Sequence, residues 1–308
     1  MCIAAIATAA PLIAQDPIAT SPAADEAFLA LGDAGNRMTV PVSIGTSGPY
    51  GFIIDTGAER TVLSRELARH LRLGAGRDVR VTSMSGSSTV GTVIVPGLEV
   101  SRIARSMVEA PALGGNDLGA PGMLGVDSLQ GHAVSIDFEK NQMTLRPVAR
   151  KRLKVSSTPG EVVVLAKSLY GQLIVTDAHY RDHRISVIID TGSPVTIANL
   201  AMLRVMKKPP KPLGQISVTS ATGDLMLVDY AQVDRLEIGG ILFADVPVGF
   251  VDAAPFKYFG LTEEPALLLG MDALRMFRSV QIDFVSRQVR FLFPRGGMVN
   301  DPGVRVGL

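Results

Sequence analysis

The chain has 308 residues, of which 47% are hydrophobic and 19% are charged. This balance is typical of a folded globular protein and excludes a largely disordered one. Because 30 Lys and Arg residues face 29 Asp and Glu residues, the sequence shows no basic excess for nucleic acid or an anionic membrane. The single cysteine, Cys2, excludes a disulfide framework and a cysteine-rich zinc site.

The start of the chain has the pattern of an export signal. Residues 2–15 carry no charge, are too few for a membrane-spanning helix and contain small residues where a signal peptidase could cut. The segment lacks a basic beginning, so the alternatives are a tail or a start further upstream. We predict a signal peptide over 1–15, a flexible lead-in over 16–36, and a periplasmic or secreted protein. No other apolar run reaches about 18 residues, so no membrane span is expected in the mature chain.

A long internal repeat determines the expected organisation. Residues 37–57 and 171–192 each contain two β-rich runs around a turn and end in Ile-Ile-Asp-Thr-Gly. Four further matches follow in the same order: 81–83 with 218–220, 98–100 with 236–238, 122–129 with 267–274, and 136–138 with 282–284. The offset grows from 135 to 146 residues, and seven of the added residues fall between 238 and 267. A repeat of this length predicts two similar lobes rather than a solenoid.

Each half is expected to be mainly β, with one short helix after its Asp-Thr-Gly motif. Short alternating runs of apolar and polar residues, punctuated by Gly and Pro, are typical of strands. Ser64 is placed to cap a helix through Leu73, and Asn199 to cap a helix through Met206. The predicted segments are an N-terminal lobe over 37–150, a linker over 151–160, a C-terminal lobe over 161–295 and a tail over 296–308.

The two Asp-Thr-Gly motifs carry the expected chemistry. They comprise Asp55, Thr56 and Gly57 in the first half and Asp190, Thr191 and Gly192 in the second, each after a buried-looking apolar triplet. If the lobes pack about a pseudo-twofold axis, the two carboxylates meet there and share one proton. One can then act as a general base on water and the other as a general acid on a substrate carbonyl. The threonine hydroxyls are expected to bond across the axis, and this chemistry needs no metal and no cofactor.

The stretches 53–64 and 188–199 resemble the active-site segments of aspartic peptidases, most closely those of bacterial retropepsin-like proteins. Residues 122–125 and 267–270 resemble the hydrophobic-hydrophobic-Gly element of that family, which places Gly125 and Gly270 under the active-site loops. The resemblance covers residues 37 to 294. It implies a bilobal acid-protease fold with β-barrel-like lobes, an active site at their pseudo-twofold interface, and hydrolysis of a peptide or protein substrate in an extended cleft.

The same resemblance implies a flap hairpin in each lobe, at 83–92 and 220–230. It makes five residues candidates for contact with substrate: Met84, Ser85, Gly86, Thr222 and Gly223. Ser193 is expected to support the dyad, whereas Pro194 raises the question of whether the local hydrogen bonds are kept. Neither flap carries a Tyr near its tip, and Tyr230 lies too far along for that role.

Several other polar residues are expected to be structural. Asp127 and Asp272 are predicted to cap helices or form turns, and Asp137 and Asp283 to form turns. His179 and His183 have the spacing of a helical metal pair but fall on an expected hairpin, where this spacing does not define one face. We therefore assign no metal site.

The leading hypothesis is an aspartic endopeptidase in which Asp55 and Asp190 form the dyad. The alternatives are a catalytically silent peptide-binding pseudo-peptidase and a processing protease for one partner protein. A dyad blocked by the insertion at 251–265 would favour the silent protein. Because one chain contains both motifs, it is expected to be a monomer.

Overall fold

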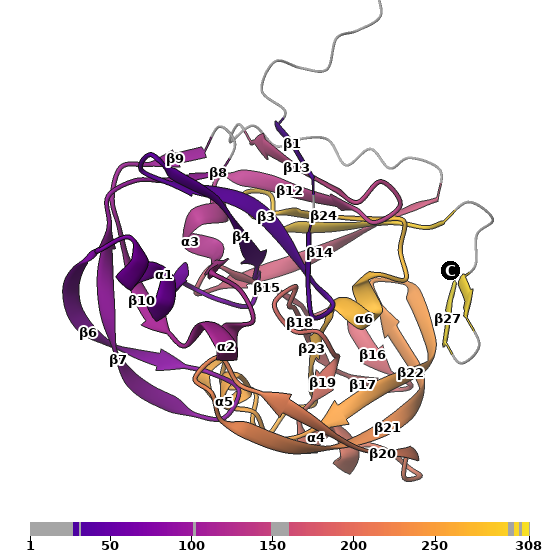
Figure 1. Cartoon of the computed structure of the whole chain (residues 1–308). Helices are drawn as coiled ribbons and strands as arrows, with labels where there is room; N and C mark the ends of the chain where they lie inside the picture. Colours follow the sequence, from indigo (N-terminus) through magenta and orange to yellow (C-terminus); the bar gives the residue numbers. More distant parts are fainter. Residues whose placement is uncertain are drawn as a thin grey trace, which may run out of the picture.

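The computed structural model describes residues 27–30, 32–100, 103–148, 160–294, 299–301 and 304–307. Within these ranges the protein is mainly β with six short helices, arranged as two lobes (Figure 1), which confirms the predicted fold. The predicted signal peptide over 1–15 and all but the last residue of the predicted linker lie outside the described residues. None of the described helices is long and apolar enough to cross a membrane.

The first lobe is a curled sheet in which the strand order is β6-β7-β10-β5-β11-β4-β3-β8-β9, with β2 paired to β3. Its strands are β2 (Gly32–Ala34), β3 (Arg37–Ile44), β4 (Ser47–Ile54), β5 (Val62–Ser64), β6 (Gly74–Thr82), β7 (Ser87–Val95), β8 (Leu98–Val100), β9 (Ile103–Arg105), β10 (Val108–Leu113) and β11 (Gly122–Leu124). Its helices are α1 (Arg65–His70), α2 (Gly115–Leu118) and α3 (Val126–Leu129).

The second lobe repeats this arrangement, with longer strands near its flap. Its strands are β15 (Gln172–Val175), β16 (Ala178–Tyr180), β17 (His183–Arg184), β18 (Ser186–Ile189), β19 (Ile197–Ala198), β20 (Lys211–Thr219), β21 (Leu225–Ile238), β22 (Ile241–Phe250) and β23 (Ala266–Leu269). Its helices are α4 (Leu200–Arg204), α5 (Ala254–Tyr258) and α6 (Met271–Leu274). A hairpin of β26 (Val299–Asp301) and β27 (Val304–Gly307) pairs with β22, so the predicted tail contributes strands to this lobe.

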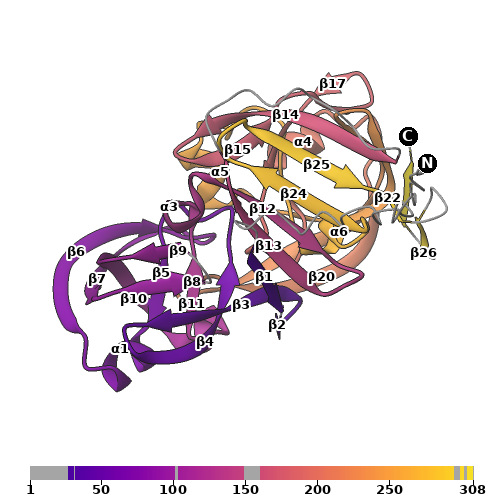
Figure 2. The ribbon, with the colours of Figure 1, turned by 90° about the horizontal axis from the view of Figure 1, so that it is seen from above.

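A six-stranded sheet joins the lobes (Figure 2). In spatial order it contains β1 (Ala27–Ala30), β13 (Gln142–Pro147), β12 (His132–Asp137), β24 (Ser279–Asp283), β25 (Gln288–Leu292) and β14 (Glu161–Leu169). At its centre β12 and β24 run antiparallel, and Ser135 pairs with Gln281. These two residues are equivalents in the repeat, so the pseudo-twofold axis passes through this pair.

The structure corrects some boundaries predicted from the sequence. Strands β1 and β2 lie within the range 16–36, which was predicted as a lead-in, because β1 pairs with β13 and β2 with β3. Ser64 and Asn199 do cap α1 and α4, but both helices end earlier than predicted. Helix α1 stops because Arg72 adopts a left-handed conformation with φ of 53°, a common way to end a helix.

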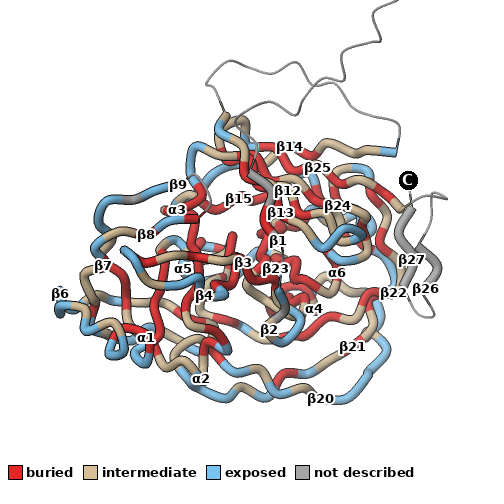
Figure 3. Tube along the Cα trace, turned by 45° about the horizontal axis from the view of Figure 1, so that its top comes forward, coloured by how far each residue is buried: buried red, intermediate tan, exposed pale blue. Residues whose placement is uncertain are grey.

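Burial is concentrated inside the lobes and along the inter-lobe sheet, whereas the hairpins that face each other across the molecule are more exposed (Figure 3). Strands β6 and β20, at the outer edges of these hairpins, are almost entirely exposed or half-buried. The two hairpins therefore project from packed lobes, on the side of the molecule opposite the inter-lobe sheet (Figure 1).

Candidate active site

Each Asp-Thr-Gly motif begins where a buried strand ends. The last three residues of β4 and of β18 are almost completely buried, as expected for strands covered on both faces. Beyond β4, the backbone N–H of Asp55 donates to the Leu124 carbonyl of β11 at 2.9 Å. Beyond β18, the Asp190 N–H donates to the Leu269 carbonyl of β23 at 3.1 Å. The parallel pairs β4–β11 and β18–β23 thus fix the backbone of both aspartates.

The two threonines tie the motifs together across the pseudo-twofold axis. The Thr56 N–H donates to Thr191 Oγ1 at 3.1 Å, and the Thr191 N–H donates to Thr56 Oγ1 at 3.2 Å. Each hydroxyl also donates to a carbonyl of the opposite lobe, Thr56 to Ile189 and Thr191 to Ile54, both at 2.8 Å. Because all these groups are buried, breaking the network would leave several polar atoms unsatisfied. The network holds the two lobes in register at the dyad.

Each carboxylate is oriented by the backbone of its own loop. Asp55 Oδ1 accepts hydrogen bonds from the N–H groups of Gly57 and Ala58, at 2.8 and 2.9 Å. Asp190 Oδ1 accepts from Gly192 and Ser193, at 2.9 and 3.1 Å. The pattern is the same in both lobes, so Pro194 leaves it intact.

The two glycines permit the carboxyl groups to approach the axis. A Cβ atom at Gly57 would lie 2.6 Å from Asp190 Cγ, and one at Gly192 would lie 2.2 Å from Asp55 Cγ. Both distances are far below a normal contact, so only glycine fits at either position. Each carboxyl group therefore rests against the glycine of the opposite motif.

Burial raises the pKa of both dyad carboxyls. For Asp55, whose pKa lies well above its usual value, repulsion from Asp190 adds to desolvation. The pKa of Asp190 is also raised by burial, but its hydrogen bonds to backbone N–H groups and to Asp55 act in the opposite direction. The pair therefore shares one proton over a range of pH.

Gly125 and Gly270 lie beneath the active-site loops. A Cβ atom at Gly125 would be 2.4 Å from the backbone carbon of Arg60, and one at Gly270 would be 2.5 Å from that of Val195. Their N–H groups donate to the hydroxyls of Thr61 and Thr196, at 3.2 and 3.1 Å. The close contact leaves no room for a side chain at either glycine.

The structure gives Asp127 and Asp272 a different role from the predicted one. The N-caps of α3 and α6 are Gly125 and Gly270, without a capping side chain. Asp127 instead accepts from the N–H and hydroxyl of Thr61, at 2.8 and 2.7 Å. Asp272 binds Thr196 in the same way, at 3.0 and 2.6 Å. The two acids therefore brace the loops that carry the dyad, whereas Asp137 and Asp283 accept backbone N–H groups of turns, as predicted.

The hairpins β6–β7 and β20–β21 meet at their tips. We call them flap 1, with its tip at residues 83–86, and flap 2, with its tip at residues 220–224. The contacts across the seam join Ser83 to Thr222 at 2.9 Å, Ser85 to Ser220 at 3.2 Å, and Ser85 to Asp224 at 2.7 Å. Ser85 and Thr222 therefore hold the flaps together instead of lining the cleft. Gly86 lies at the tip of flap 1, and Gly223 supplies a φ of +95° at the tip of flap 2.

Each flap tip also crosses to the opposite lobe. Met84 packs on an apolar cluster of the second lobe that includes Ile174 and Phe256. Its repeat equivalent, Ala221, packs on a first-lobe cluster that includes Leu113 and Leu118. The flaps thus roof the space above the dyad from both sides.

A cleft with about 1360 Å³ of empty volume lies between the dyad and the flaps. Asp55, Asp190 and Met84 all line it. It also exposes residues that the sequence reasoning did not single out, chiefly Arg37, Gln172 and Tyr258. None of them belongs to a recognisable motif. The one signal in the sequence is that Arg37 precedes Asp55 by the same number of residues as Gln172 precedes Asp190.

The insertion at 251–265 forms one wall of this cleft and leaves both aspartates facing it. Its helix α5 holds flap 1, because the Ala254 N–H donates to the Met84 carbonyl at 3.0 Å. Tyr258 of the same helix donates to Glu59 of the first lobe at 3.0 Å. In the sequence, this element was indicated by the seven residues that the second half gains between 238 and 267.

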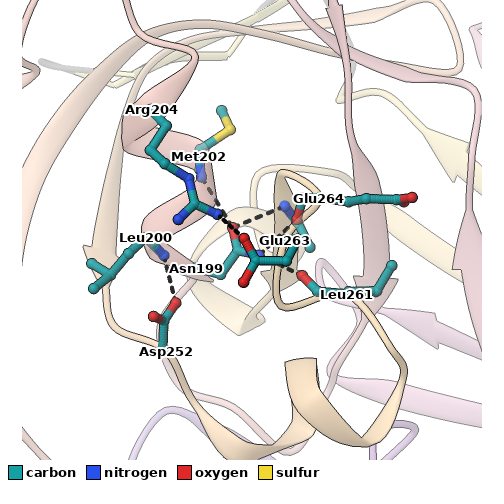
Figure 4. Close-up of polar contacts among 9 residues, drawn as sticks. Asn199, Leu200, Met202, Arg204, Asp252, Leu261, Glu263 and Glu264 are labelled. Carbon is teal, nitrogen blue, oxygen red and sulfur yellow. Dashed lines mark hydrogen bonds and ion pairs between the residues drawn. The ribbon is translucent and has the colours of Figure 1, made fainter.

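The insertion is fastened to the second lobe by the cap of α4 (Figure 4). The buried Asn199 side chain donates to the carbonyls of Leu261 and Glu264, both at 2.7 Å, and accepts from the Met202 N–H at 3.1 Å. Asp252 accepts from the Leu200 N–H at 2.9 Å. Both ends of the insertion are therefore anchored to one helix terminus.

Comparison with known proteins agrees with this geometry. Residues 40–128 and 175–273 match the sequence model of one family, described as aspartyl protease. The two segments are equivalent parts of the two lobes and together cover more than half of the chain. The comparison with curated proteins found no match.

Proposed function

Because the chain belongs to the aspartyl protease family, we propose that it is an aspartic endopeptidase in which Asp55 and Asp190 are the catalytic residues. The proposal is carried by one observation. The two carboxyls lie against each other's motif at the axis, each oriented by two N–H groups, at the floor of a cleft roofed by both flaps. This arrangement fits an extended peptide held above a shared proton.

In the proposed mechanism the dyad moves two protons and forms no covalent intermediate. Ionised Asp190 takes a proton from water as the water oxygen bonds to the scissile carbonyl carbon, and Asp55 gives its proton to the carbonyl oxygen. The resulting gem-diol then returns a hydroxyl proton to Asp55, while Asp190 gives its proton to the amide nitrogen. The C–N bond breaks, and the products are a carboxylic acid and an amine.

The direct test is cleavage of a diverse peptide library from pH 3 to 7 by the protein and by its Asp55→Asn and Asp190→Asn variants. We expect either substitution to lower kcat/KM by at least about 10³-fold, because each removes one half of a unit that acts together. Asn preserves the carbonyl oxygen that accepts the loop N–H groups, so both variants should fold, which thermal denaturation checks. Cleavage that survives both substitutions would rule out this dyad. No cleavage by the unmodified protein would favour the silent peptide-binding alternative.

The dependence of activity on pH provides a second check. For the free enzyme, kcat/KM should follow a bell whose limbs report the two pKa values of the pair. Since burial and the repulsion between the two carboxyls oppose loss of the second proton, we expect the upper limb above pH 3.8, the ordinary value for Asp. An upper limb at or below that pH would contradict a buried dyad.

We also propose that the protein is exported and monomeric. Export is supported by the uncharged residues 2–15, and sequencing the mature N-terminus would test it. The monomer is supported by the presence of both motifs in one chain, which completes the site without a second copy; sedimentation would test it.

A further inference from the structure

Arg37 places a positive charge in the cleft. The side chain is half-buried at the start of β3, and its guanidinium donates to the carbonyls of Leu118 at 2.7 Å and Ala34 at 3.3 Å. Within the described part of the chain, no carboxylate lies within 4.0 Å of it, and Nη1 has no hydrogen-bond partner. The carbonyls therefore fix the guanidinium plane, and among the described residues Nη1 is left without a partner on a side chain that lines the cleft.

The repeat shows what occupies the same position in the second lobe. Gln172 follows Arg37 by 135 residues, as Asp190 follows Asp55. Its Nε2 donates to the Gly57 carbonyl at 3.1 Å, whereas its Oε1 is buried and has no partner in the described structure. The two sides of the cleft thus present different groups, a cation on one side and an uncharged amide on the other.

A second pair of repeat equivalents differs in charge in the loops that follow the two Asp-Thr-Gly motifs. Gln172 lies beside the loop that carries Gly57 and Glu59. Its repeat equivalent in the second lobe is the loop that carries Gly192 and Pro194, again 135 residues further on. Pro194 therefore stands where the first loop carries the acid Glu59, so the second loop offers no carboxylate at this position. Glu59 itself accepts from Tyr258.

A half-buried guanidinium with no carboxylate in contact among the described residues retains part of its desolvation cost. Desolvation accordingly lowers the pKa of Arg37, while the negative charge of the dyad raises it. An anionic group of the substrate would compensate the charge, and a carboxylate matches the guanidinium geometry best because it accepts two parallel hydrogen bonds.

We propose that Arg37 forms a carboxylate-binding subsite, so that the enzyme prefers peptides with Asp or Glu at one position near the scissile bond. This inference rests on the proposed function and deepens it by naming a class of substrate.

The test uses blocked peptides that differ only in Glu or Gln at each position around the cleaved bond, at a pH above about 5 so that Glu is ionised. We expect a ratio of kcat/KM for Glu over Gln of about 10 or more at one position on one side only, the range for a hydrogen bond to a charged group. Arg37→Gln should bring this ratio to about 1, and Arg37→Lys should keep part of it. Arg80→Gln, which changes an exposed arginine elsewhere on the cleft wall, is the matched control and should keep the full ratio.

The same ratio can be measured without turnover. Fluorescence anisotropy of labelled Glu and Gln peptides with the Asp55→Asn variant should show the same preference and its loss on adding Arg37→Gln. A ratio near 1 in the unmodified protein, a ratio that survives Arg37→Gln, or one lost in Arg80→Gln would overturn the subsite. Cleavage without an acid preference would reject the subsite alone, whereas selective binding without cleavage would reject the proposed function alone.

A peptide C-terminus carries the same carboxylate chemistry. Peptides with a free or amidated C-terminus distinguish the two sources. A Glu preference that persists in amidated peptides supports a side-chain subsite. Binding that instead requires the free terminus would overturn the proposed position inside an extended peptide.

Discussion

The two flaps are equivalent in the repeat, yet the structure holds them differently. Their seam is nearly symmetric, since Ser83 with Thr222 and Ser85 with Ser220 are equivalent pairs. Flap 1, however, inserts the long side chain of Met84 into the second lobe, where flap 2 presents only Ala221 to the first. Flap 1 is also held by α5, because the Ala254 N–H donates to the Met84 carbonyl. On the other side of the cleft, α2 of the first lobe makes no such backbone hydrogen bond to flap 2 among the described residues.

This difference indicates that flap 1 is the more firmly anchored of the two. The anchor is stiff, because the insertion that carries α5 is itself fastened by Asn199. Flap 2 approaches α2 closely at Gly223, where a Cβ atom would lie 2.8 Å from an Asp117 oxygen, but no backbone hydrogen bond joins the two in the described structure. We therefore expect substrate entry to move flap 2 more than flap 1.

The substitution expected to disturb the unequal anchoring of the two flaps most strongly is Asn199→Ala. It removes the cap of α4 and leaves the buried carbonyl of Leu261 and the amide of Ala266 without their partners, so we expect a loss of about 3 kcal/mol in the free energy of unfolding. Within the described residues, the side chain of its repeat equivalent Ser64 accepts only from the Leu67 N–H, so Ser64→Ala should cost about 1 kcal/mol. Chemical denaturation of both variants measures the difference; equal losses would contradict the special role of Asn199.

A more selective change is Ala254→Pro, which removes the N–H that binds the Met84 carbonyl. Proline is tolerated in the first turn of a helix, so α5 should persist. Losing one hydrogen bond should speed amide exchange of Ser83 in flap 1 by up to about tenfold. The matched amide of Ser220 in flap 2, bonded to Asp224 as Ser83 is to Gly86, should change less. Equal acceleration at both amides would mean that α5 does not anchor one flap specifically.

The seam can be weakened from the side of flap 2 by Asp224→Asn. Hydrogen bonds from Ser85 and Thr222 lower the pKa of Asp224, so its contribution to the seam is present at neutral pH and is lost as the pH falls through that lowered pKa. We expect exchange of the Ser220 amide to rise a few-fold in the variant at neutral pH. The unmodified protein should approach the variant at low pH. Exchange that does not depend on pH in either protein would show that the carboxylate does not hold the seam.

The smallest effect is expected from Tyr258→Phe. The variant loses the bond to Glu59 but keeps the packing of the ring against Tyr170 and Phe259. Burial and the nearby Glu59 raise the pKa of Tyr258 to about 12, so the hydroxyl remains a donor at all pH values relevant to activity. Exchange of the Ser83 amide should rise less than about twofold. A change as large as that of Ala254→Pro would place the main anchor at Tyr258 instead.

Much of this organisation could be predicted from the sequence, because the repeat predicts both lobes and its two motifs predict which strands end at the axis. The inter-lobe sheet could not be predicted in the same way. Strand β1 is only four residues long, and its pairing with β13 joins segments more than a hundred residues apart.

The functional details that were missed share one cause, since each depends on contacts between segments distant in the chain. Asp127 lies in a helix-start pattern, yet its side chain binds Thr61, 66 residues earlier. Arg37 lies in an ordinary strand pattern, and only the fold places it in the cleft. Spacing within one segment contains no information on such contacts.

The pairing of Ser135 with Gln281 on the axis has a consequence for how this protein can vary over generations. In a symmetric dimer of identical chains, every substitution appears on both sides of the axis at once. Here the two sides are encoded separately, and even the residues on the axis itself are no longer the same. One side can therefore acquire a charge, a larger side chain or an inserted helix while the other keeps its original form. Arg37, Met84 and α5 are differences that a homodimer could not hold on one side alone.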